Sequence, residues 1–190
     1  LGRLKLRVAG IHNVYNALAT VATAFELEIP FQVSQETLSE FSGIQRRFQI
    51  KGEKKGILVV DDYGHHPVEI MATLKAARTG WKRRIVAVFQ PHRYTRTQAL
   101  FQDFLTAFYD ANVLLLTEIY PAGEDRIEGV EAKALYEGMR EHGHKDVAFI
   151  ADKKEIVDHL LQIVTPGDLV ITLGAGDIWQ VSEELVKRLG

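Results

Sequence analysis

Two polar segments of the chain combine residue types that could bind and activate a small charged ligand. Residues 61–67, DDYGHHP, place two acids, a tyrosine and two histidines in one short turn. Residues 90–97, QPHRYTRT, carry a histidine beside two arginines. Because a guanidinium is a planar fork that suits a carboxylate or a phosphate, the second segment predicts an anion site. A capped loop and a solvated basic loop are the plain alternatives.

Two further loops carry weaker chemical signals. The acidic loop at residues 117–124, TEIYPAGE, suits an amine ligand or simply caps a turn. Residues 174–178, GAGDI, resemble a glycine turn before a helix, whose amino end can face a phosphate. The spacing of a full dinucleotide motif is absent, and a tight turn with Asp177 as its cap explains the segment as well.

Two clusters earlier in the chain also offer polar groups. Asn13 and Asn16 are one helical turn apart and follow His12. An asparagine can cap a helix, whereas its paired donor and acceptor also suit a base edge such as adenine. Arg46 and Arg47 are adjacent, which indicates either a second cationic site or a solvated surface.

Several of these segments lie at the ends of predicted strands. Short β-branched runs alternate with segments of helical periodicity, which predicts βαβ units and a mainly parallel sheet covered on both faces. The predicted strands are 57–60, 85–89, 113–117, 147–150 and 169–173, and the predicted helices are 67–78, 97–109, 130–142, 153–164 and 178–189. We therefore predict a doubly wound α/β domain over residues 43–190, with ligands bound beyond the carboxyl ends of the strands.

Residues 1–42 have a different pattern. Leu4, Leu6 and Val8 alternate with charged residues, which predicts a half-buried strand. An Ala-rich helix over 13–27 and a short helix over 34–41, capped by Ser34, are expected to follow. We interpret this region as a strand-helix-helix remnant of a preceding domain, and the whole chain as part of a longer protein.

Composition excludes several classes of function. The 190 residues include no cysteine, which excludes disulfides, cysteine zinc sites and thiol nucleophiles. The net charge of −2 argues against a nucleic-acid partner. No apolar run approaches the roughly 20 residues of a membrane span, and no signal-peptide pattern is present. We expect a cytoplasmic protein without a membrane or nucleic-acid partner; the sequence indicates no oligomeric state.

Taken together, these segments resemble the motifs of the Mur ligase family. Residues 10–19, GIHNVYNALA, resemble its HNxxNxxAA segment, and residues 43–48, GIQRRF, resemble its arginine motif. Residues 61–67 resemble its D-Y-A/G-H-x-P motif, whereas 90–97 and 174–178 resemble the branch that adds L-alanine. The resemblance extends over essentially the whole chain, with the motifs in the family's order.

The resemblance implies an enzyme of three domains. Residues 1–42 would end a central ATPase domain, and residues 43–190 would form a carboxy-terminal Rossmann-like domain. The implied reaction joins L-alanine to UDP-N-acetylmuramate at the expense of ATP, through an acyl phosphate, in peptidoglycan synthesis for cell growth and division. Carried over by position, the nucleotide-binding residues are Asn13, Asn16, Arg47 and Asp62. The alanine-binding residues are Tyr63, His65, His92, Arg93 and Arg96.

The sequence also departs from the family pattern. It lacks the G-x-x-x-x-G-K-[ST] phosphate loop, the magnesium ligands and the modified lysine of the central domain. The resemblance therefore implies that the missing domain holds most of ATP and Mg²⁺, that this piece alone is inactive, and that it contains no catalytic residue. Which of His65 and His66 faces the ligand is left open. A ligase for a recycled tripeptide and a non-catalytic nucleotide- or anion-binding module are the alternatives.

Overall fold

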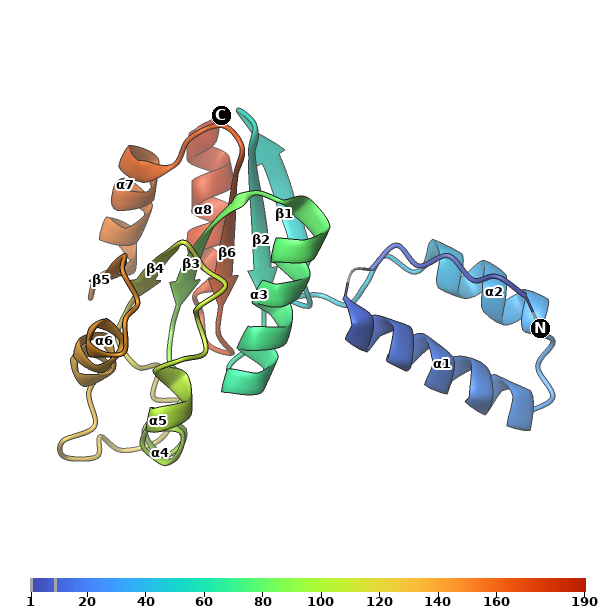
Figure 1. Ribbon diagram of the computed structural model, residues 1–190, viewed down its shortest axis with the longest axis horizontal. Coiled ribbons are helices and arrows are strands. Elements are labelled where there is room, and N and C mark those ends of the chain that lie inside the picture. The colour runs from blue at the N-terminus through green and yellow to red at the C-terminus, as the bar shows by residue number, and fades with distance from the viewer. Residues whose placement is uncertain (1, 9) are drawn as a thin grey trace.

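The computed structural model describes residues 2–8 and 10–190, arranged as a helical pair and a larger α/β unit (Figure 1). The pair consists of α1 (Ile11–Glu26) and α2 (Phe31–Glu40), which pack against each other. Residues 41–48 connect the pair to the α/β unit. The amino end of α1 is the end of the pair that lies nearer to the sheet (Figure 1).

The α/β unit is built on one six-stranded sheet with the order β1-β2-β6-β3-β4-β5. The strands are β1 (Gln49–Lys54), β2 (Ile57–Asp62), β3 (Arg84–Phe89), β4 (Val113–Leu116), β5 (Val147–Phe149) and β6 (Asp168–Leu173). Strand β1 pairs with β2 in the antiparallel sense, and all other pairs are parallel. Because β6 lies between β2 and β3, the carboxyl ends of β2, β6, β3 and β4 are neighbours.

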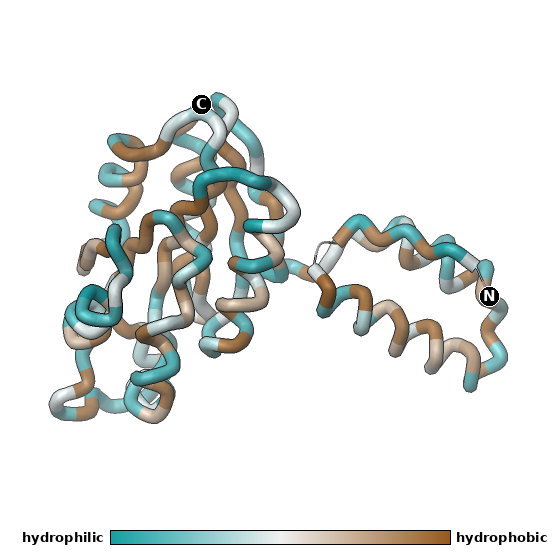
Figure 2. The backbone as a smooth tube through the Cα atoms, viewed as in Figure 1, coloured by the Kyte–Doolittle hydropathy of each residue, from teal (hydrophilic) through white to brown (hydrophobic). Residues whose placement is uncertain are grey.

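Helices cover both faces of the sheet. They are α3 (Pro67–Trp81), α4 (Tyr94–Ala99), α5 (Phe101–Phe104), α6 (Ala132–Glu141), α7 (Lys153–Ile163) and α8 (Trp179–Leu189). Leu58 and Val60 point into a core formed with α3, α5 and α6, whereas Ile57 and Val59 point into a core formed with α7 and α8. Hydrophobic residues accordingly run along the central strands (Figure 2). This confirms the predicted doubly wound α/β fold.

Three local predictions are wrong. Residues 4–8 form no strand, because a strand needs a hydrogen-bonded neighbour and no strand lies beside them in the described part of the chain. Ser34 is buried inside α2, which begins after Pro30 instead. The helix predicted over 97–109 is divided into α4 and α5 at Leu100, whose backbone leaves the helical region.

Strand β1 was not predicted from the sequence. Its residues, QIKGEK, are mostly polar, and Ile50 is exposed, as an edge strand allows. Lys55 and Gly56 both have positive φ, 50° and 76°, which is the geometry of a tight hairpin turn. No helix among the described residues combines the length and the apolar character needed to cross a bilayer.

Candidate functional site

The polar loops at the carboxyl ends of the strands come together in a row of four rings. Tyr63 and His65, which follow β2, meet edge to face with their ring centroids 5.5 Å apart. His65 lies 5.8 Å from His92, which follows β3, and His92 stacks on Tyr120, which follows β4, at 5.6 Å. The structure thus brings together three of the residues predicted around the amino acid.

Arg96 holds His92 in one protonation state. Its Nη1 lies 3.0 Å from His92 Nδ1 and donates to the His92 carbonyl oxygen, also at 3.0 Å. Because a guanidinium can only donate, Nδ1 accepts and the ring proton is on Nε2. Burial lowers the pKa of His92 to about 4, with help from the charges of Arg96, of His65 when it is protonated, and of Arg93, against that of Glu124. His92 is therefore a neutral donor at neutral pH.

Arg93 is held in an unfavourable backbone conformation. Its φ is 74°, a region that costs a residue with a β-carbon about 1–3 kcal/mol. The strained conformation is retained because the Arg93 N–H donates to the Tyr120 carbonyl oxygen at 2.8 Å. The Arg93 carbonyl oxygen also accepts from the N–H and the hydroxyl of Thr97. The guanidinium is half exposed and lies 3.5 Å from Glu124. Backbone strain of this kind concentrates at functional sites, so it supports the anion-site interpretation of this loop.

Glu124 fixes the acidic loop to the start of α4. Its carboxylate accepts from the Thr95 hydroxyl at 2.6 Å and from the Thr95 N–H at 3.1 Å. The bond from the Thr95 hydroxyl is the main reason that the pKa of Glu124 is lowered, and the charge of Arg93 adds to it. The acidic loop was predicted either to bind an amine or to cap a turn, and these contacts of Glu124 favour the capping role.

The two neighbouring histidines have different positions. His66 is the N-cap residue of α3, and its Nδ1 accepts from the Val68 N–H at 3.3 Å. Glu69 completes this capping box by accepting from the N–H groups of His65 and His66. Burial would raise the pKa of Glu69, but these bonds and the charges of His65 and Arg47 lower it. His65, not His66, therefore faces the ring row.

Glu69 was not identified from the sequence. An acid three residues after a helix cap is the usual signal of a capping box, and here the cap is a histidine rather than serine or threonine. The signal was present, but it indicated a helix start rather than a contact with His65.

Asp62 lies beneath the site rather than on its surface. Its carboxylate is buried and accepts from the N–H groups of Phe48 and Gly64, each at 2.7 Å. Burial raises its pKa, and these two bonds, the charge of Arg47 and the bond from the Thr73 hydroxyl only partly oppose the change. These contacts fix the connecting segment to the end of β2.

The two adjacent arginines have opposite environments. Arg46 donates to the buried Asp61 carboxylate at 2.9 Å and to the carbonyl oxygens of Gly176 and Gly174 at 2.9 and 2.6 Å. The Arg47 side chain is 53% exposed, and its guanidinium lies 5.7 Å from the Tyr63 ring centroid. Arg46 therefore serves the fold, whereas Arg47 can reach a ligand.

The asparagine pair lies on α1, away from the ring row. Asn16 donates to Asn13 Oδ1 at 3.3 Å, and Gly10 occupies the cap position of the helix. Neither asparagine is therefore needed as a helix cap. Both lie in the first turns of α1, at the end of the helical pair nearer to the sheet (Figure 1).

The glycine turn after β6 packs under the ring row. Asp177 accepts from Gln90 at 2.9 Å and pairs with Lys153. Burial would raise the pKa of Asp177, but the bonds from Lys153 and Gln90 lower it. With the Gly174 and Gly176 carbonyls accepting from Arg46, the structure favours a tight turn over a phosphate loop.

We expect Gly176→Ala to destabilise the protein by about 1–3 kcal/mol, the usual result of overpacking. The added β-carbon would lie 2.7 Å from Tyr120 Cγ and would also collide with Gln90 Oε1. Urea unfolding would measure the loss. Gly80→Ala is the matched control, because nothing lies within 4 Å of its β-carbon and alanine favours the helix. Equal stability of both variants would contradict the packing argument.

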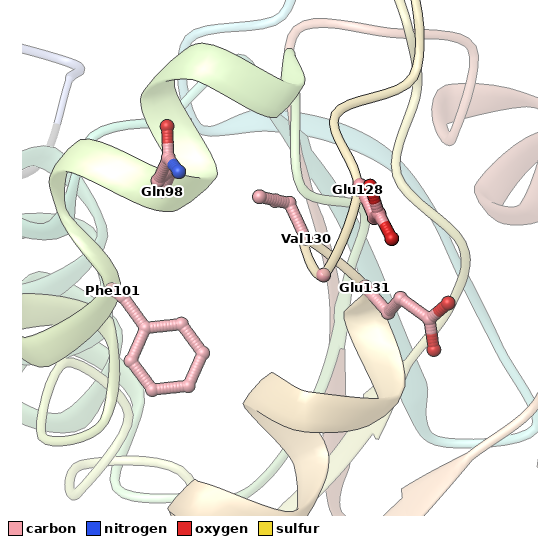
Figure 3. Close-up of a pocket in the computed structure, with 6 residues that line it drawn as sticks. Gln98, Phe101, Glu128, Val130 and Glu131 are labelled. Atoms are coloured by element: carbon pink, nitrogen blue, oxygen red, sulfur yellow. The ribbon is translucent and has the colours of Figure 1, made fainter.

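A separate hollow of about 200 Å³ lies between the helices that follow β3 and the segment before α6 (Figure 3). Its lining includes Gln98 and Phe101 on one side and Glu128 to Glu131 on the other. None of the predicted ligand residues lines it, and its two glutamates would repel an anion. We therefore place the site at the ring row and not here.

A comparison with known families agrees with this geometry. A family model described as "Mur ligase, glutamate ligase domain" matches residues 46–176. The chain belongs to the Mur ligase family. The family resemblance predicted from the sequence is thereby confirmed, and the match contains the ring row, Arg46 and Arg47, the loop at 90–97 and the two glycines of the turn after β6.

Individual Mur ligases match the chain along its length. The UDP-N-acetylmuramate–L-alanine ligase of Geotalea uraniireducens is 59% identical over 189 residues, which are 100% of this chain and 41% of that protein. The crystal structure of the UDP-N-acetylmuramate–alanine ligase from Thermotoga maritima has a TM-score of 0.82 at 31% identity and covers 99% of this chain and 40% of that one. The chain thus spans about two fifths of these Mur ligases.

A further Mur ligase shares the fold. The murein peptide ligase from Psychrobacter arcticus has a TM-score of 0.67 at 24% identity, with 98% of this chain and 38% of that one covered. At this identity the likeness shows a common architecture and not a common substrate.

Proposed function

We propose that the full-length protein containing this chain is a cytoplasmic, ATP-dependent ligase that joins L-alanine to UDP-N-acetylmuramate in peptidoglycan precursor synthesis. The observation that carries the proposal is the cluster of His92, Arg93 and Arg96 beside Tyr63 and His65 at the carboxyl edge of the sheet. The 59% identity to a ligase with this name supports the choice of substrates.

The cluster suits the carboxylate of a small amino acid. Arg93 is half exposed, Arg96 lies beside His92, and the neutral His92 ring offers an Nε2–H donor. Each charge-assisted hydrogen bond contributes about 1.5–3 kcal/mol net. Two such bonds give roughly millimolar affinity once the ordering costs of binding are subtracted.

The nucleotide is proposed to lie at the junction of the helical pair and the sheet. Arg47 is the exposed cation of the connecting segment and is proposed to contact the ATP phosphates. Asn13 and Asn16, on the first turns of α1, are proposed to contact the adenine. Asp62 is buried, so we propose that it acts on the nucleotide by fixing the segment that carries Arg47.

We expect Asn16→Ala to weaken ATP binding to the full-length protein by about tenfold, the equivalent of one lost hydrogen bond. The Asn13 side chain would also lose the hydrogen bond that it accepts from Asn16. Titration calorimetry would measure the affinity. Gln32→Ala, at an exposed position of the neighbouring helix α2, is a control for surface substitution, and an unchanged Asn16→Ala affinity would refute the adenine contact.

We propose that residues 1–42 end a central domain and that residues 43–190 form the amino-acid-binding domain. The helical pair leaves large apolar side chains exposed, which an isolated pair of helices cannot bury. They include Ile11, Tyr15, Leu18, Phe25, Leu27 and Val33. The occupant we propose for this face is the remainder of the central domain.

Magnesium is not assigned to these residues. Within residues 2–8 and 10–190, no three histidine or acidic side chains gather as a metal-binding group. When bound, Mg²⁺ would neutralise charge on the ATP phosphates, and we propose that the central domain supplies its ligands together with most of the ATP contacts. The chain alone is accordingly proposed to be inactive.

The test is ADP release by the full-length protein with UDP-N-acetylmuramate, ATP and each amine substrate in turn. Release that depends on L-alanine supports the proposal. Release that depends only on a tripeptide would instead favour the ligase for recycled peptides, whose relative here shares the fold alone. No amine-dependent release, together with ATP binding, would favour a non-catalytic nucleotide-binding module.

A further inference from the structure

We propose that His65 is the general base that removes a proton from the ammonium group of the incoming amino acid. This role rests on the ligase function proposed above. It gives this chain a catalytic residue, whereas the sequence indicated only ligand binding for His65.

The hydrogen bonds of His65 determine which ring nitrogen is basic. Its Nδ1 lies 3.0 Å from the carbonyl oxygen of Tyr63 and 3.6 Å from Oε2 of Glu69. Both oxygens can only accept, so Nδ1 carries the proton of the neutral ring. The lone pair is therefore on Nε2, which is the nitrogen that can take a proton from a ligand.

This nitrogen is available to a ligand. The His65 side chain is 20% exposed, and no donor in residues 2–8 or 10–190 pairs with its Nε2. The ring stands between Tyr63 and His92, in the row that also presents the two arginines. A base must lie within hydrogen-bond reach of the proton that it removes, and the position of His65 beside His92 is the geometric basis on which we assign it this role.

His92 cannot serve as the base in this arrangement. Its Nδ1 accepts from Arg96, which leaves only an Nε2–H donor. The pKa of about 4, caused first by burial and then by Arg96, agrees with a ring that takes up protons poorly. The two rings thus have complementary roles, since His92 donates to a carboxylate while His65 accepts from an ammonium.

The distance between the His65 and His92 rings suits the two charged groups of an amino acid. The carboxylate and the ammonium are attached to one carbon, and the centroids of His65 and His92 are 5.8 Å apart. An α-amino acid with its carboxylate on Arg96 and His92 can therefore present its ammonium to His65. A ligand without an α-ammonium would leave the lone pair of His65 unused.

Charged groups from three elements surround His65. Glu69 lies on α3, which follows the loop that carries His65, and Arg47 lies on the connecting segment. His92 lies in the loop after β3, and Arg96 lies on α4. Glu69 lies nearest and is the group that would stabilise the imidazolium formed by proton transfer, as an orienting carboxylate does in other base-assisted sites. Arg47 lies 3.9 Å from the same carboxylate and moderates this effect.

The proposed step conserves atoms and charge. One proton passes from the ammonium nitrogen to His65 Nε2, which leaves a neutral amine. The amine lone pair attacks the carbonyl carbon of the acyl phosphate and forms the C–N bond. The C–O bond to the phosphate then breaks, and the phosphate departs with that electron pair and takes the second proton from nitrogen.

The test compares two nucleophiles in the full-length protein carrying His65→Asn. Asparagine retains a donor for the Tyr63 carbonyl but has no basic nitrogen. We expect the alanine-dependent kcat to fall by roughly 100- to 10,000-fold, the usual contribution of a positioned base. Hydroxylamine is largely unprotonated at neutral pH and needs no base, so its hydroxamate should form at the wild-type rate. His66→Asn, which preserves a helix cap, is the matched control and should retain alanine turnover.

Other outcomes overturn the proposal. Equal losses with alanine and hydroxylamine would assign His65 a structural role, and a His65→Asn variant with normal alanine turnover would exclude it as a base. Should His65→Asn fail to fold, imidazole added to His65→Ala provides a second measurement. Restored alanine turnover supports a base, and no restoration with intact hydroxamate formation refutes it. A wild-type protein without alanine-dependent ADP release would show instead that the proposed function has failed.

Discussion

Arg46→Ala is expected to destabilise the chain by about 3–5 kcal/mol, the usual loss when one partner of a buried ion pair is removed. Asp61 is fully buried, and its carboxylate accepts from the Arg46 guanidinium at 2.9 Å and from the Thr172 hydroxyl at 2.7 Å. Without Arg46, the Asp61 carboxylate would keep the Thr172 hydroxyl as its side-chain partner among residues 2–8 and 10–190. The carbonyl groups of Gly174 and Gly176 lose their donor at the same time.

The neighbouring Arg47 provides a control within one residue. Its side chain is 53% exposed, and its ion pair with Glu69, at 3.9 Å, is of a kind that contributes less than about 1 kcal/mol. Arg47→Ala should therefore unfold at nearly the wild-type urea concentration. It should instead lose ATP affinity in the full-length protein, where we propose that it contacts the phosphates.

A double variant separates charge from packing. If the unpaired Asp61 carboxylate causes the loss, then adding Asp61→Asn to Arg46→Ala should recover part of the stability, because a neutral amide is less costly to bury. Equal urea midpoints for Arg46→Ala and Arg47→Ala would show that the buried pair does not hold the connecting segment in place.

The strands of the sheet could be predicted because a strand that is buried on both faces needs a continuous run of apolar residues. Runs such as ILVV in β2 and VLLL in β4 are apolar on both faces, as a parallel strand covered on both sides requires, and their alternation with helical segments favoured that assignment. The Leu4–Val8 alternation was just as regular, yet no strand formed there. Alternation of apolar and polar residues indicates that one face of a segment is apolar. It does not indicate whether a neighbouring strand is present to form the hydrogen bonds that a strand needs.

The order of the strands explains why distant loops share one site, and this order was only partly predictable. Sequence indicated that the polar turns follow parallel strands and hence lie on one edge. It did not indicate that β6 would enter between β2 and β3. That insertion places the glycine turn under Tyr120 and gives Arg46 its two carbonyl partners.

Residue types alone also left neighbours unresolved. Arg46 and Arg47, or His65 and His66, are identical in chemistry, and only the direction of the backbone separates a residue that holds the fold from one proposed to bind a ligand. The positive φ of Arg46, 60°, helps to direct the Arg46 and Arg47 side chains into different environments. The residue type arginine does not predict this backbone conformation. The sequence could therefore place these residues in neighbouring loops, but it could not tell which of two neighbours is buried and which is exposed.

Arg96→Ala is expected to raise the KM for L-alanine by about 10- to 100-fold in the full-length protein, from the loss of one charge-assisted bond of 1.5–3 kcal/mol. Arg96→Lys should recover only part of this, because an ammonium cannot hold the His92 ring and a carboxylate with one planar fork. Arg126→Ala removes an exposed arginine outside the proposed site and should leave KM unchanged. Steady-state ADP release at varied alanine would give all three values.

The same substitution should also change how alanine binding responds to pH. Burial and then the Arg96 charge keep the pKa of His92 at about 4, so the wild-type ring is neutral at neutral pH. Without Arg96 this pKa should rise toward the ordinary value of about 6.5. Acidification would then protonate His92 and return a positive charge to the proposed carboxylate site, so the KM of Arg96→Ala should fall relative to wild type as the pH is lowered. A ratio of the two KM values that stays constant between neutral and mildly acidic pH would show that Arg96 does not control the His92 ring.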